Sequence, residues 1–523
     1  MKRYIKQLLI LTLSLGALIG CYKDKGNYDY IALDAVVIDT SKAGIQPTYA
    51  VERYDILKIT PKLIINNEVV TDFASLADEY TFNWSVYQTL TGGTVHSRDT
   101  ISSDFILEKP ITKPQGSWNL LLTVKNTKTK VETYQKFTVA VSESIADGWM
   151  VLYEKDGNTD VGLITDARSQ LGAIKTTIFT DLIKNTNGAA LAGKPVAFLH
   201  SAAALNSREV IVASEKDIQA FGYTNFERLL SFEDLFTDAP TTRSIKGFTA
   251  INIGSKEIII NDNKVHIANF NRVNALSRTV PFGTSLYGNY GELESWGPKN
   301  IAQGFDAVVY DKTNKKFLYS TQNSVSLSEI PVQTSPTAEW DPSNVGLDLK
   351  AADYGFPNTP GAFEYLIMSN PTNTYLLTAN FMAPTASAFA QRKYDITAAP
   401  EITSMTAMAA SSTGAYILYG ANNAVYTHRY QINQSEKVWT APTGEQVTSI
   451  RFLKFYHVLI NGRKLTALGA NDYVYIATYN ETTKQGKVYN VKIDRTNGTI
   501  DQSTQKVYEG FGKIKDMSYK WTL

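Results

Sequence analysis

The residue types that most often carry chemistry are few in this 523-residue chain, which has five histidines and one cysteine. The histidines are His96, His200, His266, His428 and His457. No two of them have a familiar zinc-ligand spacing, and the chain has no Gly-x-Ser-x-Gly nucleophile elbow. We therefore expect neither a zinc hydrolase nor an acyl-transfer enzyme. We expect His266 and His428 to be partly buried, hydrogen-bonded residues of strands.

Acidic residues offer two weaker possibilities. Asp156-Gly157-Asn158-Thr159-Asp160 places oxygen atoms at alternate positions, as calcium loops do, and residues 494–498 repeat this pattern less well. Neither segment is followed by the bidentate glutamate of an EF-hand loop, so we interpret both as turns and expect no metal. Paired carboxylates for glycoside cleavage stay open, because their separation depends on the fold.

Aromatic residues on two long loops are the remaining candidates for ligand contact. Residues 281–300 and 340–360 combine rings with glycines and prolines. The candidate ligand-binding residues are Tyr287, Tyr290, Trp296, Trp340, Tyr354 and Phe356. Rings on a loop stack against sugars or cover a peptide backbone. The alternative is that these rings pack the loops onto the sheets or fill the centre of the fold, as long loops often do.

The N-terminal residues predict where the protein acts. Residues 1–20 combine a basic start with an apolar run at residues 8–19, which is typical of a secretory signal and too short to cross a bilayer as a helix. Leu18-Ile19-Gly20-Cys21 resembles the bacterial lipobox, which implies cleavage before Cys21 and acylation of that residue. Residues 21–30 would then be a lipidated tether. Apart from this lipid we expect no cofactor.

Composition excludes some function classes and favours one fold class. Removal of Lys2, Arg3 and Lys6 with the signal leaves 48 basic and 50 acidic residues, so nucleic-acid binding is not expected. Thirty Tyr, 22 Phe and seven Trp favour strands. We therefore predict an all-β protein with at least two domains.

Residues 31–145 show about seven short alternating segments, as expected for an immunoglobulin-like β-sandwich. Tyr80-Thr81-Phe82-Asn83-Trp84 and the segment 116–124 resemble the two marker strands of polycystic-kidney-disease (PKD) domains. Together with Cys21 and residues 23–30, they resemble the PKD-like lipoprotein family of Bacteroidetes.

Residues 148–523 contain hairpins that recur every 40 to 60 residues. The predicted hairpins are residues 149–164, 208–221, 257–270, 316–330, 374–394, 415–430 and 473–493. Repeating β units of this period predict a β-propeller of about seven blades, and residues 513–521 could complete the first blade. Two stacked sandwiches are the alternative architecture.

The family resemblance also implies a setting. Similar lipoproteins accompany a TonB-dependent outer-membrane transporter of the SusCD type and its substrate-binding lipoprotein. By this resemblance the protein would be a noncatalytic, lipid-anchored accessory subunit in the outer membrane, at the cell surface or facing the periplasm, that captures an oligopeptide or oligosaccharide. The alternatives are a propeller enzyme, such as a glycosidase or lyase, and a purely structural subunit.

Overall fold

The computed structural model describes residues 33–42, 44–88, 98–113, 116–142, 145, 147–171, 173, 175–201, 209–251, 256–269, 280–355, 363–454 and 468–520. The predicted signal, Cys21 and the tether lie outside these residues, as does Phe356. The chain forms two compact units. The sandwich unit comprises Met1–Val51, Asp55–Ile111 and Gln115–Val141, and the propeller unit comprises Glu52–Tyr54, Thr112–Pro114 and Ser142–Leu523.

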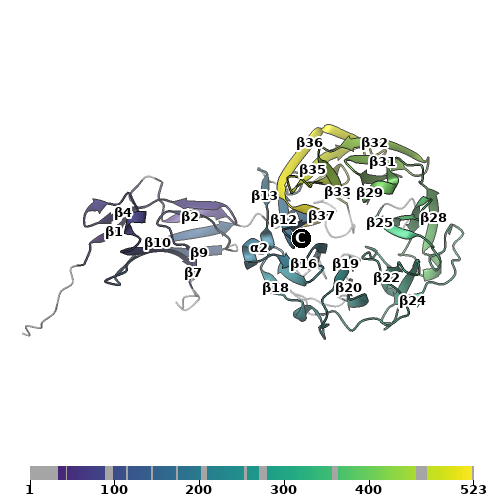
Figure 1. The fold of residues 1–523 in the computed structure, drawn as a ribbon, viewed down its shortest axis with the longest axis horizontal. Coiled ribbons are helices and arrows are strands. Elements are labelled where there is room, and N and C mark those ends of the chain that lie inside the picture. The colour runs from purple at the N-terminus through teal and green to yellow at the C-terminus, as the bar shows by residue number, and fades with distance from the viewer. Residues whose placement is uncertain are drawn as a thin grey trace, which may run out of the picture. The chain divides into compact units, whose positions relative to one another are not determined.

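Strands make up most of both units (Figure 1). In the described part of the chain no helix is long and apolar enough to cross a membrane. The regular helix α2 spans only Leu182–Asn187. The predicted all-β fold class is confirmed.

The described strands of the sandwich unit form three sheets. The five-stranded sheet has the order β2 (Thr48–Glu52), β10 (Glu132–Ser142), β9 (Gly116–Asn126), β6 (Tyr80–Tyr87), β7 (Asp99–Ser102). The others are β1 (Val36–Asp39), β4 (Lys62–Ile65) and β5 (Glu68–Val69), and the pair β3 (Ile56–Ile59) and β8 (Leu107–Pro110). Trp84 lies fully buried between them, stacks on Phe137, and donates from Nε1 to the Phe105 carbonyl at 3.0 Å. The indole thus fills the core while its one polar atom is paired.

In the propeller unit the described strands form seven sheets that follow one another around a ring (Figure 1). The first sheet has the order β13 (Thr177–Phe179), β12 (Asn158–Thr165), β11 (Gly148–Lys155), β37 (Lys513–Lys520), and β14 (Leu191–Ala192) also pairs with β12. The second contains β15 (Pro195–Ser201), β16 (Glu209–Ser214), β17 (Ile218–Gly222) and β18 (Arg228–Leu230). The third contains β19 (Ile245–Ile251), β20 (Lys256–Asn261) and β21 (Lys264–Asn269), and the fourth β22 (Phe305–Asp311), β23 (Lys316–Thr321) and β24 (Ser328–Glu329).

The other three sheets have four strands each. The fifth contains β25 (Asp348–Tyr354), β26 (Glu364–Ser369), β27 (Thr374–Ala379) and β28 (Ala390–Asp395). The sixth contains β29 (Met405–Ala410), β30 (Ile417–Ala421), β31 (Ala424–Arg429) and β32 (Gln434–Thr440). The seventh contains β33 (Glu445–Phe452), β34 (Tyr473–Asn480), β35 (Gln485–Ile493) and β36 (Ile500–Phe511). Each predicted hairpin coincides with two consecutive strands of a different sheet, which favours the propeller over stacked sandwiches.

The last strand closes the ring. β37 pairs antiparallel with β11, from Gly148 opposite Lys520 to Glu154 opposite Lys513. The prediction that residues 513–521 complete the first blade is therefore correct for the described part of this segment. The first sheet joins strands from both ends of the unit.

Residues 293–300 occupy the inner edge of the fourth sheet without forming a full strand. Leu293 bridges to Asp311, and the Glu294 N–H donates to the Tyr310 carbonyl at 2.8 Å. Pro298 has no N–H to give to a ladder, and Gly297 weakens a strand. This inner segment therefore runs beside β22 but pairs with it only at its start.

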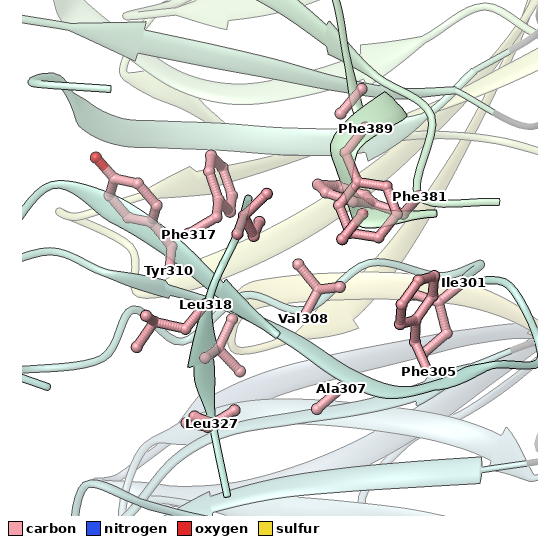
Figure 2. Close-up of a cluster of buried hydrophobic side chains, with 14 of the residues drawn as sticks. Ile301, Phe305, Ala307, Val308, Tyr310, Phe317, Leu318, Leu327, Phe381 and Phe389 are labelled. Atoms are coloured by element: carbon pink, nitrogen blue, oxygen red, sulfur yellow. The ribbon is translucent and has the colours of Figure 1, made fainter. Parts of the chain in front are cut away.

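The third, fourth and fifth sheets share a cluster of buried side chains (Figure 2). A row of aromatic rings runs through it: Phe381 contacts Phe317 and Phe389, and Phe389 contacts Phe305 at 5.2 Å between centroids. Strands buried on both faces explain why the sequence shows continuous apolar runs here rather than strict alternation.

Hairpin turns follow from Asn, Asp and Gly at positions of positive φ. Asp262 and Asn263 have φ of 49° and 57°, and Asp156 and Gly157 have φ of 52° and 75°. These values suit the tight turns that match strand twist. Asp156 and Gly157 thus form the turn between β11 and β12, as the turn interpretation predicts. Asp160 instead accepts hydrogen bonds from backbone N–H groups at the start of α2.

Candidate functional site

A cavity of about 750 Å³ lies in the propeller unit, and strands of the ring's inner edge form its wall. The wall includes residues of β15, β19, β25, β29, β33 and β37, together with the inner segment 293–300. Six of the seven sheets, and the inner segment beside the fourth, therefore contribute to one central cavity. Its size is typical of a pocket for a small-molecule ligand.

The chemistry of the wall is mixed. It carries acidic and basic side chains in similar numbers, beside apolar ones such as Phe248, Met408 and Trp296. A wall of this kind can hold a ligand that is polar along its length and still offers some apolar surface.

An ion pair is buried on one side of the cavity. Lys454, which follows β33, has a fully buried side chain and pairs with Asp353 of β25. The lysine Nζ also donates to the Tyr354 carbonyl, and Asp353 accepts the N–H of Ala410 at 2.8 Å. Burial lowers the pKa of Lys454, and the Asp353 charge opposes this effect. The pair links three sheets and satisfies both charges within the protein.

Glu364, the first residue of β26, lies next to this pair and is 1% exposed. Its Oε1 accepts the N–H of Lys299 at 2.7 Å, but its Oε2 has no hydrogen-bond partner among the described residues. Burial raises the pKa of Glu364 to about 7; the Lys299 N–H opposes the rise and the Asp353 charge adds to it. Burial thus favours the neutral, protonated form of this carboxyl group.

A second polar atom nearby is also unpartnered. Asn300 is 8% exposed, lines the cavity and has no hydrogen-bond partner for Nδ2 in the part of the chain that the structure describes. Buried polar atoms are normally paired, so such exceptions call for an explanation.

The predicted aromatic candidates do not gather at one place. Among the five that are described, Trp296 alone lines the cavity. Its ring also contacts the rings of Phe317 and Phe381, with 6.0 Å between the ring centroids in each pair. Tyr287 is 72% exposed, and Tyr290 packs half-buried against the cluster of Figure 2.

The two candidates of the second loop also pack within the fold. Trp340 packs on Phe317 and donates from Nε1 to the Thr378 carbonyl at 3.2 Å. Tyr354 is half-buried at the end of β25, and burial raises its pKa. Phe356 falls outside the described residues.

Sequence reasoning missed the polar residues of the cavity. No motif contains Asp353, Glu364, Lys454 or Asn300. The first two belong to the fifth sheet, whereas Lys454 follows β33 and Asn300 ends the inner segment. A weak signal exists: Glu364 and Lys454 each stand beside runs of apolar residues, where a charge is unusual unless it is paired or functional.

Two of the histidines are placed as predicted. His266 is buried in β21, and its Nδ1 hydrogen-bonds to the Gly283 carbonyl at 2.9 Å. His428 is buried in β31, and its Nδ1 hydrogen-bonds to Ser435 Oγ at 2.9 Å. Burial lowers the pKa of His428 to about 4, so this imidazole is neutral in the folded protein at pH 7.

Comparisons with known proteins agree with part of the sequence interpretation. Residues 21–195, about a third of the chain, match the model of the PKD-like family. This match confirms the resemblance to PKD-like proteins. A comparison with curated proteins found no match.

The solved structures that match this chain have low sequence identity and TM-scores below 0.5. A quinonprotein alcohol dehydrogenase-like protein from Bacteroides thetaiotaomicron is 13% identical, with 90% of this chain and 96% of that chain covered and a TM-score of 0.49. The WD40 domain of SCAP from fission yeast is 9% identical, with 60% and 74% covered and a TM-score of 0.35. A functionally unknown protein from Desulfotomaculum acetoxidans is 13% identical, with 58% and 81% covered and a TM-score of 0.37.

Proposed function

We propose that this protein is a noncatalytic binding protein that takes an oligopeptide or oligosaccharide into the central cavity of its propeller. The observation that carries the proposal is the cavity of about 750 Å³, whose wall combines charged groups, apolar side chains and unpartnered polar atoms. Binding pockets have this composition because apolar contact supplies affinity while a few polar groups fix the orientation of the ligand.

The setting of this binding protein follows from the leader and the family resemblance. Acylation at Cys21 would anchor the mature chain in the outer membrane, where it would serve a TonB-dependent transporter and its substrate-binding lipoprotein. An anchored binder raises the local concentration of its ligand, and a second contact to the same complex adds avidity. Cys21→Ala would abolish acylation, and fractionation should then recover the protein outside the membrane pellet.

Affinity purification from native membranes in mild detergent, followed by mass spectrometry of proteins and small molecules, tests the proposal. We expect stoichiometric recovery of the transporter and its lipoprotein, together with a bound peptide or sugar. Trp296→Ala should reduce the bound small molecule, because this ring lines the cavity. Tyr287→Ala is the matched control, since Tyr287 comes from the same loop and is 72% exposed outside the cavity.

Two results would contradict the proposal. Recovery of the protein alone would remove the transporter setting. If the transporter is recovered but uptake is unchanged in the Trp296→Ala variant, whose ring is removed from the cavity wall, the protein is a structural subunit rather than a ligand binder.

One observation favours an enzyme as the second candidate. Asp353 and Glu364 place two carboxyl groups at the cavity, and the pKa of about 7 for Glu364 suits a general acid. Asp353, however, is already paired with Lys454. Incubation with pooled glycans and peptides separates the candidates: turnover that Glu364→Gln and Asp353→Asn abolish would establish an enzyme, whereas we expect none.

A further inference from the structure

Two residues of the cavity wall each carry an unpartnered polar atom. Glu364 Oε2 and Asn300 Nδ2 have no hydrogen-bond partner in the described residues, and both side chains are more than nine-tenths buried. Lys299 connects them, because its N–H binds the other oxygen of Glu364 and its next residue is Asn300. Both residues line the cavity, so one part of its wall contains an acceptor and a donor that the described part of the protein leaves unsatisfied.

The charges around Glu364 are not balanced within the protein. The groups that act on it are Asp353 and Tyr354 from β25, Lys299 from the inner segment and Lys454 after β33. Lys454 is engaged by Asp353 and the Tyr354 carbonyl. Because the two lysines do not cancel the effect of burial, the ionised carboxylate of Glu364 is unfavourable until a further cation approaches.

We propose that Glu364 and Asn300 form an anchoring subsite for the free amino end of a short peptide. The α-ammonium group donates to Glu364 Oε2, and the first carbonyl oxygen accepts a hydrogen bond from Asn300 Nδ2. This inference rests on the proposed function, since it names the ligand class of the same cavity. A neutral sugar hydroxyl can also donate to Glu364, but it brings no positive charge to offset the desolvated carboxylate.

Titration calorimetry on the detergent-solubilised full chain tests the subsite. The probes are tri-alanine, N-acetyl-tri-alanine and maltotriose. We expect tri-alanine to bind and acetylation to weaken binding by about tenfold or more, because it removes a charge-assisted hydrogen bond. Maltotriose should not displace tri-alanine.

Glu364→Gln should remove the preference for the free amine. The matched control is Glu445→Gln. Glu445 is also a buried carboxylate at the first position of a strand, but it is fully engaged by Thr478, Tyr489 and Lys487 and lies outside the cavity wall. The control variant should keep the preference, which separates recognition of the amine from the general loss of a buried charge.

Proton release gives a second readout. Binding of an ammonium group favours the ionised form of Glu364, so peptide binding at pH 7 should release protons, measured as a dependence of the binding enthalpy on buffer. Glu364→Gln should release none. Should that variant not fold, the acetylation and proton-release measurements on the unaltered protein still decide the question.

The outcomes distinguish failure of the peptide subsite from failure of the proposed function. Equal binding of free and acetylated peptide, or binding of maltotriose alone, overturns the peptide subsite and leaves the proposed function intact. If no probe binds and membrane purification recovers no small molecule, both the subsite and the proposed function fail.

Discussion

The indole of Trp149 and the phenol ring of Tyr475 stack with centroids 3.8 Å apart and 14° between their planes. Trp149 belongs to β11 in the first sheet and Tyr475 to β34 in the seventh, and each is 1% exposed. The stack therefore packs together the two sheets between which the ring closes, beside the hydrogen-bonded ladder of β11 and β37.

Truncation of this stack should destabilise the propeller. Trp149→Ala removes a fully buried ring and leaves a cavity, so we expect the free energy of unfolding to fall by about 3–5 kcal/mol in denaturant titrations. Tyr287→Ala, at a 72% exposed position, should change it by less than about 0.5 kcal/mol. Equal effects of the two changes would show that the stack adds little to closure.

Gly512, between β36 and β37, should not tolerate a side chain. A Cβ there would lie 2.0 Å from the Glu154 carbonyl oxygen, and a Cβ at Gly486 would lie 1.9 Å from the Gly512 carbonyl oxygen. Since backbone cannot move aside easily, Gly512→Ala should lower stability by about 1–3 kcal/mol, seen as a lower melting temperature. Gly304→Ala is the control, because nothing lies within 4 Å of its added Cβ. An unchanged melting temperature for Gly512→Ala would refute this close approach.

Lys454→Met should leave Asp353 as a buried charge without a counter-ion. We expect a loss of about 3–5 kcal/mol in unfolding free energy, because breaking a buried pair is costly. Adding Asp353→Asn should recover part of this loss. A double-mutant cycle by urea denaturation measures the coupling, and strictly additive effects would be evidence against it.

His428 should make the protein less stable in mild acid. Its pKa is about 4 in the folded protein and 6.5 ordinarily, so between these pH values the unfolded chain binds a proton that the folded chain does not. Stability therefore falls as pH drops from 6.5 to 4, by about 3 kcal/mol. Unfolding curves of His428→Gln at several pH values should lack this contribution. A pH dependence identical to that of the unaltered protein would argue against a buried neutral imidazole.

Glu364 should change the free energy of unfolding with pH in the direction opposite to His428. Its pKa is about 7 when folded and 4.5 ordinarily, so the folded chain keeps a proton that the unfolded chain loses. Stability from this group is present below pH 4.5 and is lost as pH rises to 7, by about 3 kcal/mol. Glu364→Gln should therefore gain stability over the unaltered protein between pH 5 and 8, while the two should run parallel below pH 4.5. A constant difference across the whole range would contradict the raised pKa.

Much of the fold could be predicted because its repeats are local. The hairpin of β30 and β31 combines two apolar strands with Asn422 at φ 51°, and such turn chemistry is visible in the sequence. The sandwich unit shows ten described strands rather than about seven, because short strands such as β5 (Glu68–Val69) have too few residues to show alternation. The inner segment of the fourth sheet was predicted as part of a loop, because Gly297 and Pro298 interrupt the strand pattern.

The cavity could not be predicted from local pattern. Asp353 and Lys454 are 101 residues apart in sequence and meet only because the ring brings β25 and the end of β33 together. We predicted Trp296 because it is an aromatic residue on a long loop, but the same criteria also selected Tyr287, which is exposed. Residue type indicated candidates, whereas closure of the ring decided which of them face the cavity.

The pairing of β11 with β37 also imposes an order on biosynthesis. β37 is synthesised after every other strand of the propeller, so the edge of β11 that it covers stays unpaired while more than 350 intervening residues are made. A nascent chain that ends early would expose this edge permanently, and exposed edges invite aggregation or proteolysis. Pairing with β37 therefore removes this exposed edge only after every other strand of the propeller has been made.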